Sequence, residues 1–478
     1  MRKIFLIQFI FFYAVCFSQA PLRFYSKFGG NGVDIGYSAK PTLDKQYIVA
    51  GSTSSYGAGN TDVYLVKVDS MGFPIWEKYF GGFNNDVGKA VIQLPDSGYV
   101  VAGFTSSFGN GGYDIYLVKT DKVGTLIWQK TFGGLDWDFA ADLVLASDGN
   151  IVVCGNTSSM GNGKKDGILL KYDLFGTLLW QKTIGGVENE ELRSVIKTND
   201  NLLVTVGYTE SKGDVNGDGY FVKFDLNGDT LFTRYFGGAG KDYANDIVQK
   251  PNLDYVICGA KTYTTGPNPR GLMYSLSSIG LFLWENNYVG NVDKEEFISV
   301  ANSNQIAGVS GYVRQRNVPA FKLQADMFLA TVFGFSYKVN ASGGGEDEAV
   351  YSIESTTDGG YVSVGSTLSF GSIGEDVYFM KHDSTIFNYT SVVGIPEVPK
   401  NKTPIVSYNE NKVNVALQDE NATQAELVDL NGKLINRFTF IKDENNVIID
   451  MSQLLPAIYI LRIKYKNGQV YNCKLISK

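Results

Sequence analysis

Phe80-Gly81-Gly82 opens the stretch that decides the fold, and residues 80–132 read FGGFNNDVGKAVIQLPDSGYVVAGFTSSFGNGGYDIYLVKTDKVGTLIWQKTF. Four runs within it are rich in β-branched and aromatic residues, and Asp, Gly, Asn and Ser separate them. These runs cover residues 86–93, 98–103, 114–119 and 126–132. Runs of this kind are typical of β-strands, and four short strands in about 50 residues are typical of one blade of a β-propeller.

The same pattern recurs along the chain with a period of 52 residues, and three marks keep that period. The first is the residue before Gly-Gly, or its worn copy, at Phe28, Phe80, Phe132, Ile184, Phe236, Tyr288 and Ser342, where the last step is 54 residues. The second is a glycine, at Gly51, Gly103, Gly155, Gly207, Gly259, Gly311 and Gly365. The third is an aromatic residue, at Phe24, Trp76, Trp128, Trp180, Phe232 and Trp284. Seven copies predict an all-β, seven-bladed β-propeller.

The two ends of the repeat region complete each other. After Gly344 the chain provides only three strand-like runs, the last near residues 376–381. Before Gly29 stands one additional run, residues 22–28, which matches the fourth run of the other copies. We therefore predict that the N-terminal strand completes the last blade and closes the ring, which removes both open sheet edges.

Composition narrows the class of protein. Hydrophobic residues make up 44% of the chain, which is enough for a packed core. The net charge of −7 gives no electrostatic reason to bind nucleic acid, and a single histidine argues against His-dependent hydrolase and zinc chemistry. Cys154 and Cys258 occupy one repeat position that other copies fill with Ala or Val. We expect them to be small core residues rather than part of a disulfide framework.

Residues 1–20 have the pattern of a secretory signal peptide. Arg2 and Lys3 precede an apolar run over residues 4–17, and Ser18-Gln19-Ala20 ends the segment with small residues. The apolar run is too short to cross a bilayer as a stable helix. We expect an exported, monomeric protein without a transmembrane segment.

The character of the sequence changes after Asn388. Residues 392–403 are typical of a linker, and residues 404–478 are rich in strand-like runs with Asn-Gly turns at Asn431 and Asn467. We predict a signal peptide at residues 1–20, the propeller at 21–391, the linker at 392–403 and a small C-terminal domain at 404–478.

Three segments of this last domain carry a family resemblance. They are AELVDLNGKL at residues 425–434, IDMSQLLPAIYILRI at 449–463 and CKLISK at 473–478. In this order the region resembles the type A C-terminal sorting domain of type IX secretion cargo. The family usually has Gly where Ala457 stands, and an ordinary immunoglobulin-like accessory domain is the alternative.

The resemblance implies a small immunoglobulin-like β-sandwich that acts as a sorting signal. It also implies a Gram-negative bacterium of the Bacteroidota type and the type IX translocon as a partner. The expected destination is the cell surface or the medium, reached through the periplasm and the outer membrane.

One loop resembles a calcium-binding sequence. Asp214, Asn216 and Asp218 place side-chain oxygens at alternate positions before a glycine, as in an EF-hand-like loop, and Asp225 falls at the twelfth place. Val222 supplies no side-chain oxygen at the ninth place. Calcium is the candidate cofactor, the alternative is a polar loop that holds no ion, and no other cofactor is expected.

Candidate ligand-binding residues lie on the face that carries the longer Gly/Ser loops, because loops carry most binding sites. Trp137 lies in such a loop, where it would stack on a sugar or be partly buried against a neighbouring loop. Tyr263 and Arg270 replace repeat residues in blade five and suit an anionic ligand, with plain divergence as the alternative. Lys261, Arg314 and Arg316 are further replacements in blades five and six.

Acidic residues follow Gly-Gly in successive copies, at Asp34, Asp86, Asp138, Glu190, Asp242 and Asp347, with Lys294 breaking the series. A second series, Asp62, Asp114, Asp166, Asp218 and Asp376, opens the third strand. Such carboxylates either hold a cation or accept backbone N–H groups in their own turns. They also offer many carboxylate pairs for glycoside hydrolysis, and nothing selects one pair.

The sequence favours a binding or adhesion protein with a glycan or protein ligand, and it assigns no catalytic residue. A polysaccharide hydrolase or lyase on a propeller scaffold is the first alternative. A structural surface component with protein partners only is the second. The fold does not choose among them, because propellers support many functions.

Overall fold

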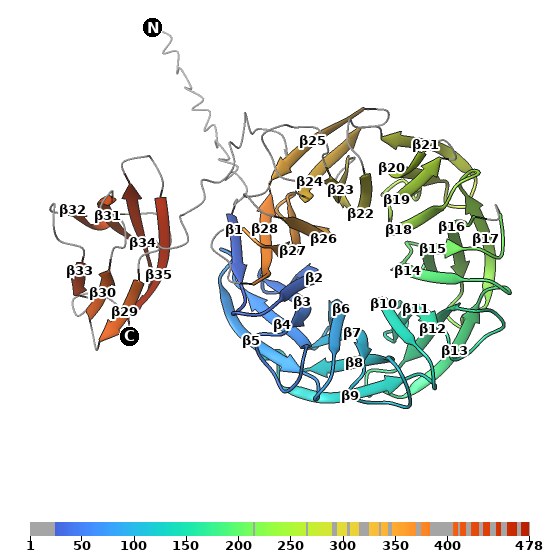
Figure 1. Cartoon of the computed structure of the whole chain (residues 1–478), viewed down its shortest axis with the longest axis horizontal. Coiled ribbons are helices and arrows are strands. Elements are labelled where there is room, and N and C mark those ends of the chain that lie inside the picture. Colours follow the sequence, from blue (N-terminus) through green and yellow to red (C-terminus); the bar gives the residue numbers. More distant parts are fainter. Residues whose placement is uncertain are drawn as a thin grey trace, which may run out of the picture.

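The computed structural model describes residues 24–213, 216–263, 266–288, 294–303, 306–314, 325–333, 336–342, 347–369 and 374–382, together with seven strands between residues 405 and 477. Strands β1 to β28 form seven four-stranded antiparallel sheets that follow one another around a ring (Figure 1). The predicted seven-bladed β-propeller is therefore confirmed.

Each blade runs from an inner strand near the axis to an outer strand at the rim. Blades one to four contain, in that order, β2 (Asp34–Pro41), β3 (Tyr47–Thr53), β4 (Asp62–Val68), β5 (Pro74–Phe80); β6 (Asp86–Gln93), β7 (Tyr99–Thr105), β8 (Asp114–Thr120), β9 (Leu126–Phe132); β10 (Asp138–Leu145), β11 (Ile151–Thr157), β12 (Asp166–Tyr172), β13 (Leu178–Ile184); and β14 (Glu190–Lys197), β15 (Leu203–Thr209), β16 (Asp218–Phe224), β17 (Thr230–Phe236). Blades five to seven contain β18 (Asp242–Gln249), β19 (Tyr255–Tyr263), β20 (Gly266–Leu276), β21 (Phe282–Tyr288); β22 (Lys294–Ser303), β23 (Ile306–Arg314), β24 (Ala325–Phe333), β25 (Ser336–Ser342); and β26 (Glu348–Ser355), β27 (Tyr361–Thr367), β28 (Asp376–His382), β1 (Phe24–Phe28).

The N-terminal strand closes the ring, as predicted. β1 pairs antiparallel with β28, with Phe24 opposite Lys381 and Phe28 opposite Val377. The ring of Phe24 packs on Phe379, with centroids 5.8 Å apart. The last blade therefore joins residues from both ends of the repeat region, so the sheet has no open edge at that position.

The core lies between neighbouring blades. Every residue of β3 and β4 is buried, because both faces of these middle strands pack on other blades. One cluster joins Val49 and Tyr64 of blade one to Val364 and Phe379 of blade seven. Cys154 and Cys258 are buried in equivalent positions and form no disulfide, so the interpretation of them as core residues is confirmed.

The repeated glycine of the second strand marks a close approach of two backbones. Gly103 in β7 lies opposite a β-bulge in β6, between Gly88 and Ala90. A Cβ on Gly103 would clash with the Val87 carbonyl oxygen and would lie 2.9 Å from the carbonyl carbon. Glycine is therefore required where the bulge brings a carbonyl oxygen against the second strand.

The repeated aromatic residue of the outer strand joins adjacent blades. Trp128 in β9 packs against Gly176, in the turn after β12 of the next blade, and its Nε1 donates to Leu174 O at 3.2 Å. Trp180 donates to Leu226 O in the same way at 3.1 Å. The outer strands β9 and β13 are thus each anchored to the next blade through this aromatic side chain.

The strand pairing in blades six and seven shows that two members of the first acidic series were assigned wrongly from the sequence. Glu348 and not Asp347 opens β26, where it pairs with Thr367 as Asp34 pairs with Thr53. In β22 the equivalent place belongs to Glu295 rather than Lys294, since Phe297 pairs with the repeat glycine Gly311. The repeat is longer and worn here, so counting by period placed the series one residue too early.

The C-terminal segment contains two antiparallel sheets. One has the order β29 (Ile405–Asn409), β30 (Lys412–Ala416), β33 (Asn446–Asp450), and the other β32 (Leu434–Thr439), β31 (Ala422–Asp429), β34 (Ala457–Tyr465), β35 (Val470–Ser477). Alternate residues such as Leu427, Leu461 and Ile463 are buried, as expected of sheets that cover a shared core. Within the described part of the chain, no helix has the length and hydropathy needed to cross a membrane.

Candidate functional site

Trp137 lies in the connection from β9 to β10, and its side chain is 58% exposed. Its ring meets the rings of Tyr113 and Phe139 edge-on, with centroids 6.1 and 6.2 Å away. Its carbonyl oxygen accepts a hydrogen bond from Ser158 N at 2.8 Å, which ties the loop to the blade. Trp137 therefore packs against two aromatic rings on one side, while more than half of its side-chain surface faces solvent.

Three further apolar side chains project from equivalent connections between blades. Phe83 is 86% exposed, Leu135 83% and Val187 71%. Each directly follows the Gly-Gly of its connection, so the three occupy one repeat position in consecutive blades. We call Phe83, Leu135, Trp137 and Val187 the apolar arc.

Local hydrogen bonds explain why the arc is exposed. Asp86 opens β6, and its Oδ2 accepts from Gly82 N at 2.7 Å and from Ser107 Oγ at 2.6 Å. These bonds hold the second glycine against the blade and leave Phe83, the next residue, at the tip of the connection. Phe83 is not among the residues predicted from the sequence, where its signal is an apolar residue directly after Gly-Gly in an otherwise polar loop.

The structure brings together Tyr263 and Arg270 but not Trp137. Tyr263 ends β19 and Arg270 belongs to β20, and the Arg270 guanidinium lies 4.9 Å from the centre of the Tyr263 ring. Both residues belong to blade five, whereas the Trp137 connection joins blade two to blade three. They form a separate candidate site; the neighbouring Lys261 is paired with Glu285 at 2.7 Å.

The described residues among the predicted calcium ligands have different local partners. Asp214 lies outside the described residues, and Asn216 Nδ2 donates to Ala239 O at 2.9 Å. Asp218 is buried at the start of β16. Asp225 lies beyond the other end of β16, where its Oδ1 accepts from Asn227 N and Asp229 N. Asp225 therefore serves its own turn, and calcium at this loop stays a prediction.

The first acidic series serves its own loops. Asp34, Asp138 and Asp242 each accept a hydrogen bond from the N–H of the preceding second glycine, at 2.6, 2.9 and 2.5 Å. Glu190 does the same from Gly186 at 2.7 Å. These bonds agree with the interpretation that the carboxylates satisfy backbone groups in their own connections.

In five of the described connections, the two acidic series also meet in pairs around the first glycine of Gly-Gly. Asp114 Oδ1 and Asp138 Oδ2 both face Gly133, so a Cβ there would collide with two carboxylates. Burial raises the pKa of Asp114, and the negative charge of Asp138 adds to this effect. Equivalent pairs surround Gly29, Gly81, Gly185 and Gly237. This repetition singles out no pair as catalytic.

Comparison with known proteins assigns the C-terminal segment. Residues 409–478 match the family described as secretion system C-terminal sorting domain. The C-terminal segment is a secretion-system sorting domain. The sorting domain places the chain among type IX secretion cargo, which is exported to the cell surface or outside the cell. Residues 43–74 match a β-propeller domain of unknown function, and neither family description names a catalytic activity.

Other similarities are distant. Regulatory protein FlaEY of Caulobacter vibrioides is 26% identical over 257 residues, which are 46% of this chain and 25% of that protein. The chain thus spans about a quarter of the length of the curated relative it matches.

The similar solved structures share little sequence identity with this chain, as two of them show. Puromycin hydrolase is 13% identical with a TM-score of 0.45, covering 91% of this chain and 57% of that one. The WD40 domain of Neurospora crassa Pan2 is 10% identical with a TM-score of 0.41, covering 75% and 95%. At these TM-scores neither structure supports a functional assignment for this chain.

Proposed function

We propose that this type IX secretion cargo is a binding or adhesion protein that engages a glycan or protein through the apolar arc. The observation that carries the proposal is the exposure of Phe83, Leu135, Trp137 and Val187 on consecutive connections of one face. In this proposal a ligand spans these neighbouring connections and covers their apolar side chains together, as partners do at exposed apolar surfaces.

The chemistry of the arc suits a ligand with apolar faces. The Trp137 indole presents a flat surface on which the C–H face of a sugar ring or an apolar side chain would stack. Burying a large apolar side chain contributes about 1.5–3 kcal/mol, so four such tips offer a substantial gross binding free energy. Immobilising both partners reduces that gain.

Two rivals make different predictions. A polysaccharide hydrolase or lyase would release reducing sugars from its substrate. A structural surface component would bind proteins and no carbohydrate. Buried carboxylate pairs recur in five connections, so no single pair stands out as the catalytic site that the enzyme hypothesis needs.

A glycan array probed with the chain from residue 21 tests the proposal, with and without calcium. Trp137→Ala should reduce any glycan signal at least about tenfold, as expected for loss of a stacking aromatic side chain. Phe175→Ala is the matched control, because Phe175 is 84% exposed in the turn after β12, at the opposite end of the blades. Equal losses in both variants would contradict binding through the arc. A blank array would leave protein ligands, to be tested by the same variants.

A further inference from the structure

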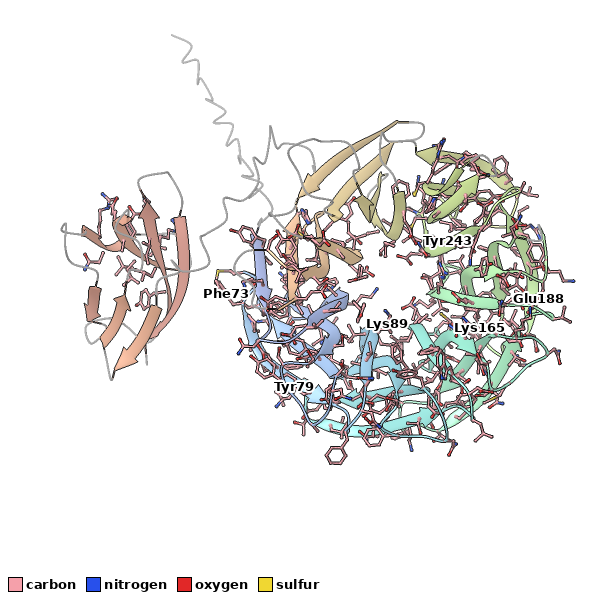
Figure 2. All side chains as sticks on the ribbon, in the orientation of Figure 1. Phe73, Tyr79, Lys89, Lys165, Glu188 and Tyr243 are labelled. Carbon is pink, nitrogen blue, oxygen red and sulfur yellow. The ribbon has the colours of Figure 1, made fainter. Side chains whose placement is uncertain are left out.

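The inner strands turn alternate side chains towards the axis of the ring, where they are half-buried (Figure 2). Most described charged groups there have partners. Lys40 of β2 pairs with Glu354 of β26, and Arg193 of β14 pairs with Glu191 at 3.0 Å. Asp246 of β18 accepts hydrogen bonds from serine hydroxyls of both neighbouring blades, at 2.7 Å each.

Lys89 in β6 differs from these groups. Its side chain points towards the axis in Figure 2, and its Nζ lies 3.6 Å from the centre of the Tyr37 ring. Tyr37 in turn packs on Tyr351, with ring centroids 5.0 Å apart. Among the described residues, Lys89 has neither a hydrogen-bond partner nor an acidic partner. The equivalent inner-strand position of blade three holds Ala141, which adds only a methyl group.

This arrangement leaves a cation in a partly desolvated place without an anion. Removing an ammonium group from water is costly unless an opposite charge or hydrogen bonds replace the water. The Tyr37 ring attracts the ammonium through its π-electrons, but the ring face is not a conventional hydrogen-bond acceptor. Burial accordingly lowers the pKa of Lys89 to about 8. Unpaired charges of this kind are candidates for ligand contacts.

We propose that the axis of the propeller binds a small oxyanion (a carboxylate, sulfate or phosphate group) through the Lys89 ammonium, with the Tyr37–Tyr351 pair as an apolar wall beside it. An oxyanion accepts charge-assisted hydrogen bonds from the ammonium, and these bonds are stronger than neutral ones. The rings of Tyr37 and Tyr351 would contact the carbon skeleton that carries the anionic group. This site is distinct from the apolar arc, so it does not depend on the proposed function.

Two sources of such a group are distinguishable by titration calorimetry on the chain from residue 21. Sodium sulfate, phosphate and acetate represent free anions, and oligogalacturonate represents an acidic polysaccharide, all measured against a chloride buffer of equal ionic strength. Saturable binding of any probe that depends on Lys89 supports the site. Tighter binding of oligogalacturonate than acetate identifies a polysaccharide source, and equal affinity identifies a free anion.

Three variants distinguish the effect of the charge at residue 89 from an effect on folding. Lys89→Met should weaken binding at least about tenfold, because it removes the ammonium at nearly constant volume. Lys89→Arg keeps the charge and should bind within about threefold of the wild type. Lys122→Met, at an exposed lysine in the turn after β8, is the control and should change nothing. Circular dichroism melts establish that each variant is folded.

A second measurement follows the amine itself. Acetic anhydride labels neutral amines, so labelling of Lys89 measured by mass spectrometry at pH 8 reports its protonation. A bound oxyanion stabilises the ammonium and should reduce that labelling several-fold, while labelling of Lys122 stays constant. Unchanged Lys89 labelling, or heats that are the same in Lys89→Met and wild type, would overturn the proposal and leave adventitious ions only.

Discussion

Replacing Gly103 by alanine should break the second blade. Gly103 lies in β7, and a Cβ at this position would clash with the Val87 carbonyl oxygen and lie 3.0 Å from Gly88 Cα. Both obstacles belong to the backbone of β6, so no side-chain rotation relieves them. Ordinary contacts between carbon atoms begin at about 3.5 Å, so the two strands would have to separate.

The size of the effect follows from what must move. Overpacking a core costs about 1–3 kcal/mol when side chains can adjust. Here the bulge and its neighbouring ladder bonds must shift as well, so we expect Gly103→Ala to lower the free energy of unfolding by at least about 3 kcal/mol. Gly238→Ala is the matched control. Its Cβ would meet nothing closer than Lys261 Cε at 3.5 Å, so a change within about 0.5 kcal/mol is expected.

Urea unfolding followed by tryptophan fluorescence measures both variants against the wild type. The midpoint should fall clearly for Gly103→Ala and stay in place for Gly238→Ala. A Gly103→Ala protein within about 1 kcal/mol of the wild type would refute the claim that this glycine is fixed by a backbone contact.

Three further predictions address the carboxylates, the contacts between blades and the calcium loop. Burial and the nearby charge of Asp218 raise the pKa of Asp242 to about 6, so its contribution to stability is complete below about pH 4 and is lost as the pH rises through 6. In urea melts, the free energy of unfolding of the wild type minus that of Asp242→Asn should therefore decrease as the pH rises from about 4 to 7. A difference that does not change with pH would contradict this. Trp128→Phe should cost about 0.5–1.5 kcal/mol by removing the bond to Leu174 O, whereas Trp137→Phe should cost almost nothing; equal losses would argue against the contact between blades. Calcium titration should produce heat with the wild type and none with Asp214→Ala, and an absence of heat with the wild type would end the calcium hypothesis.

Much of the fold follows from the sequence because each repeat mark has a local physical cause. The glycine mark reflects the backbone contact at Gly103, and the aromatic mark reflects the packing of Trp128 on the next blade. The closure of the ring was predictable because the sequence of β1 matches the fourth strand-like run that the last repeat copy lacks. The register at Glu295 and Glu348 was not, since it depends on strand pairing rather than on period.

The candidate sites were less predictable. Trp137 was selected from the sequence because an aromatic residue in a loop is conspicuous, and its role in binding stays a prediction. Phe83 was not selected, because its exposure depends on bonds between Gly82 and Asp86. Lys89 occupies an ordinary strand position in the sequence. Its lack of an acidic partner among the described residues depends on which side chains of neighbouring blades face the axis, and no local pattern encodes that arrangement.

A comparison of the two ends of the propeller tests the central claim that the longer-loop face binds the ligand. One variant carries Phe83→Ser, Leu135→Ser and Val187→Ser, and the other carries Val123→Ser, Phe175→Ser and Ile279→Ser in the turns at the opposite end, where these side chains are also exposed. The measurement is the retention of each fluorescently labelled protein, beginning at residue 21, on intact Bacteroidota cells. The account predicts that the first variant loses retention while the second binds like the wild type. Equal retention of both variants, or loss in the second alone, would contradict it.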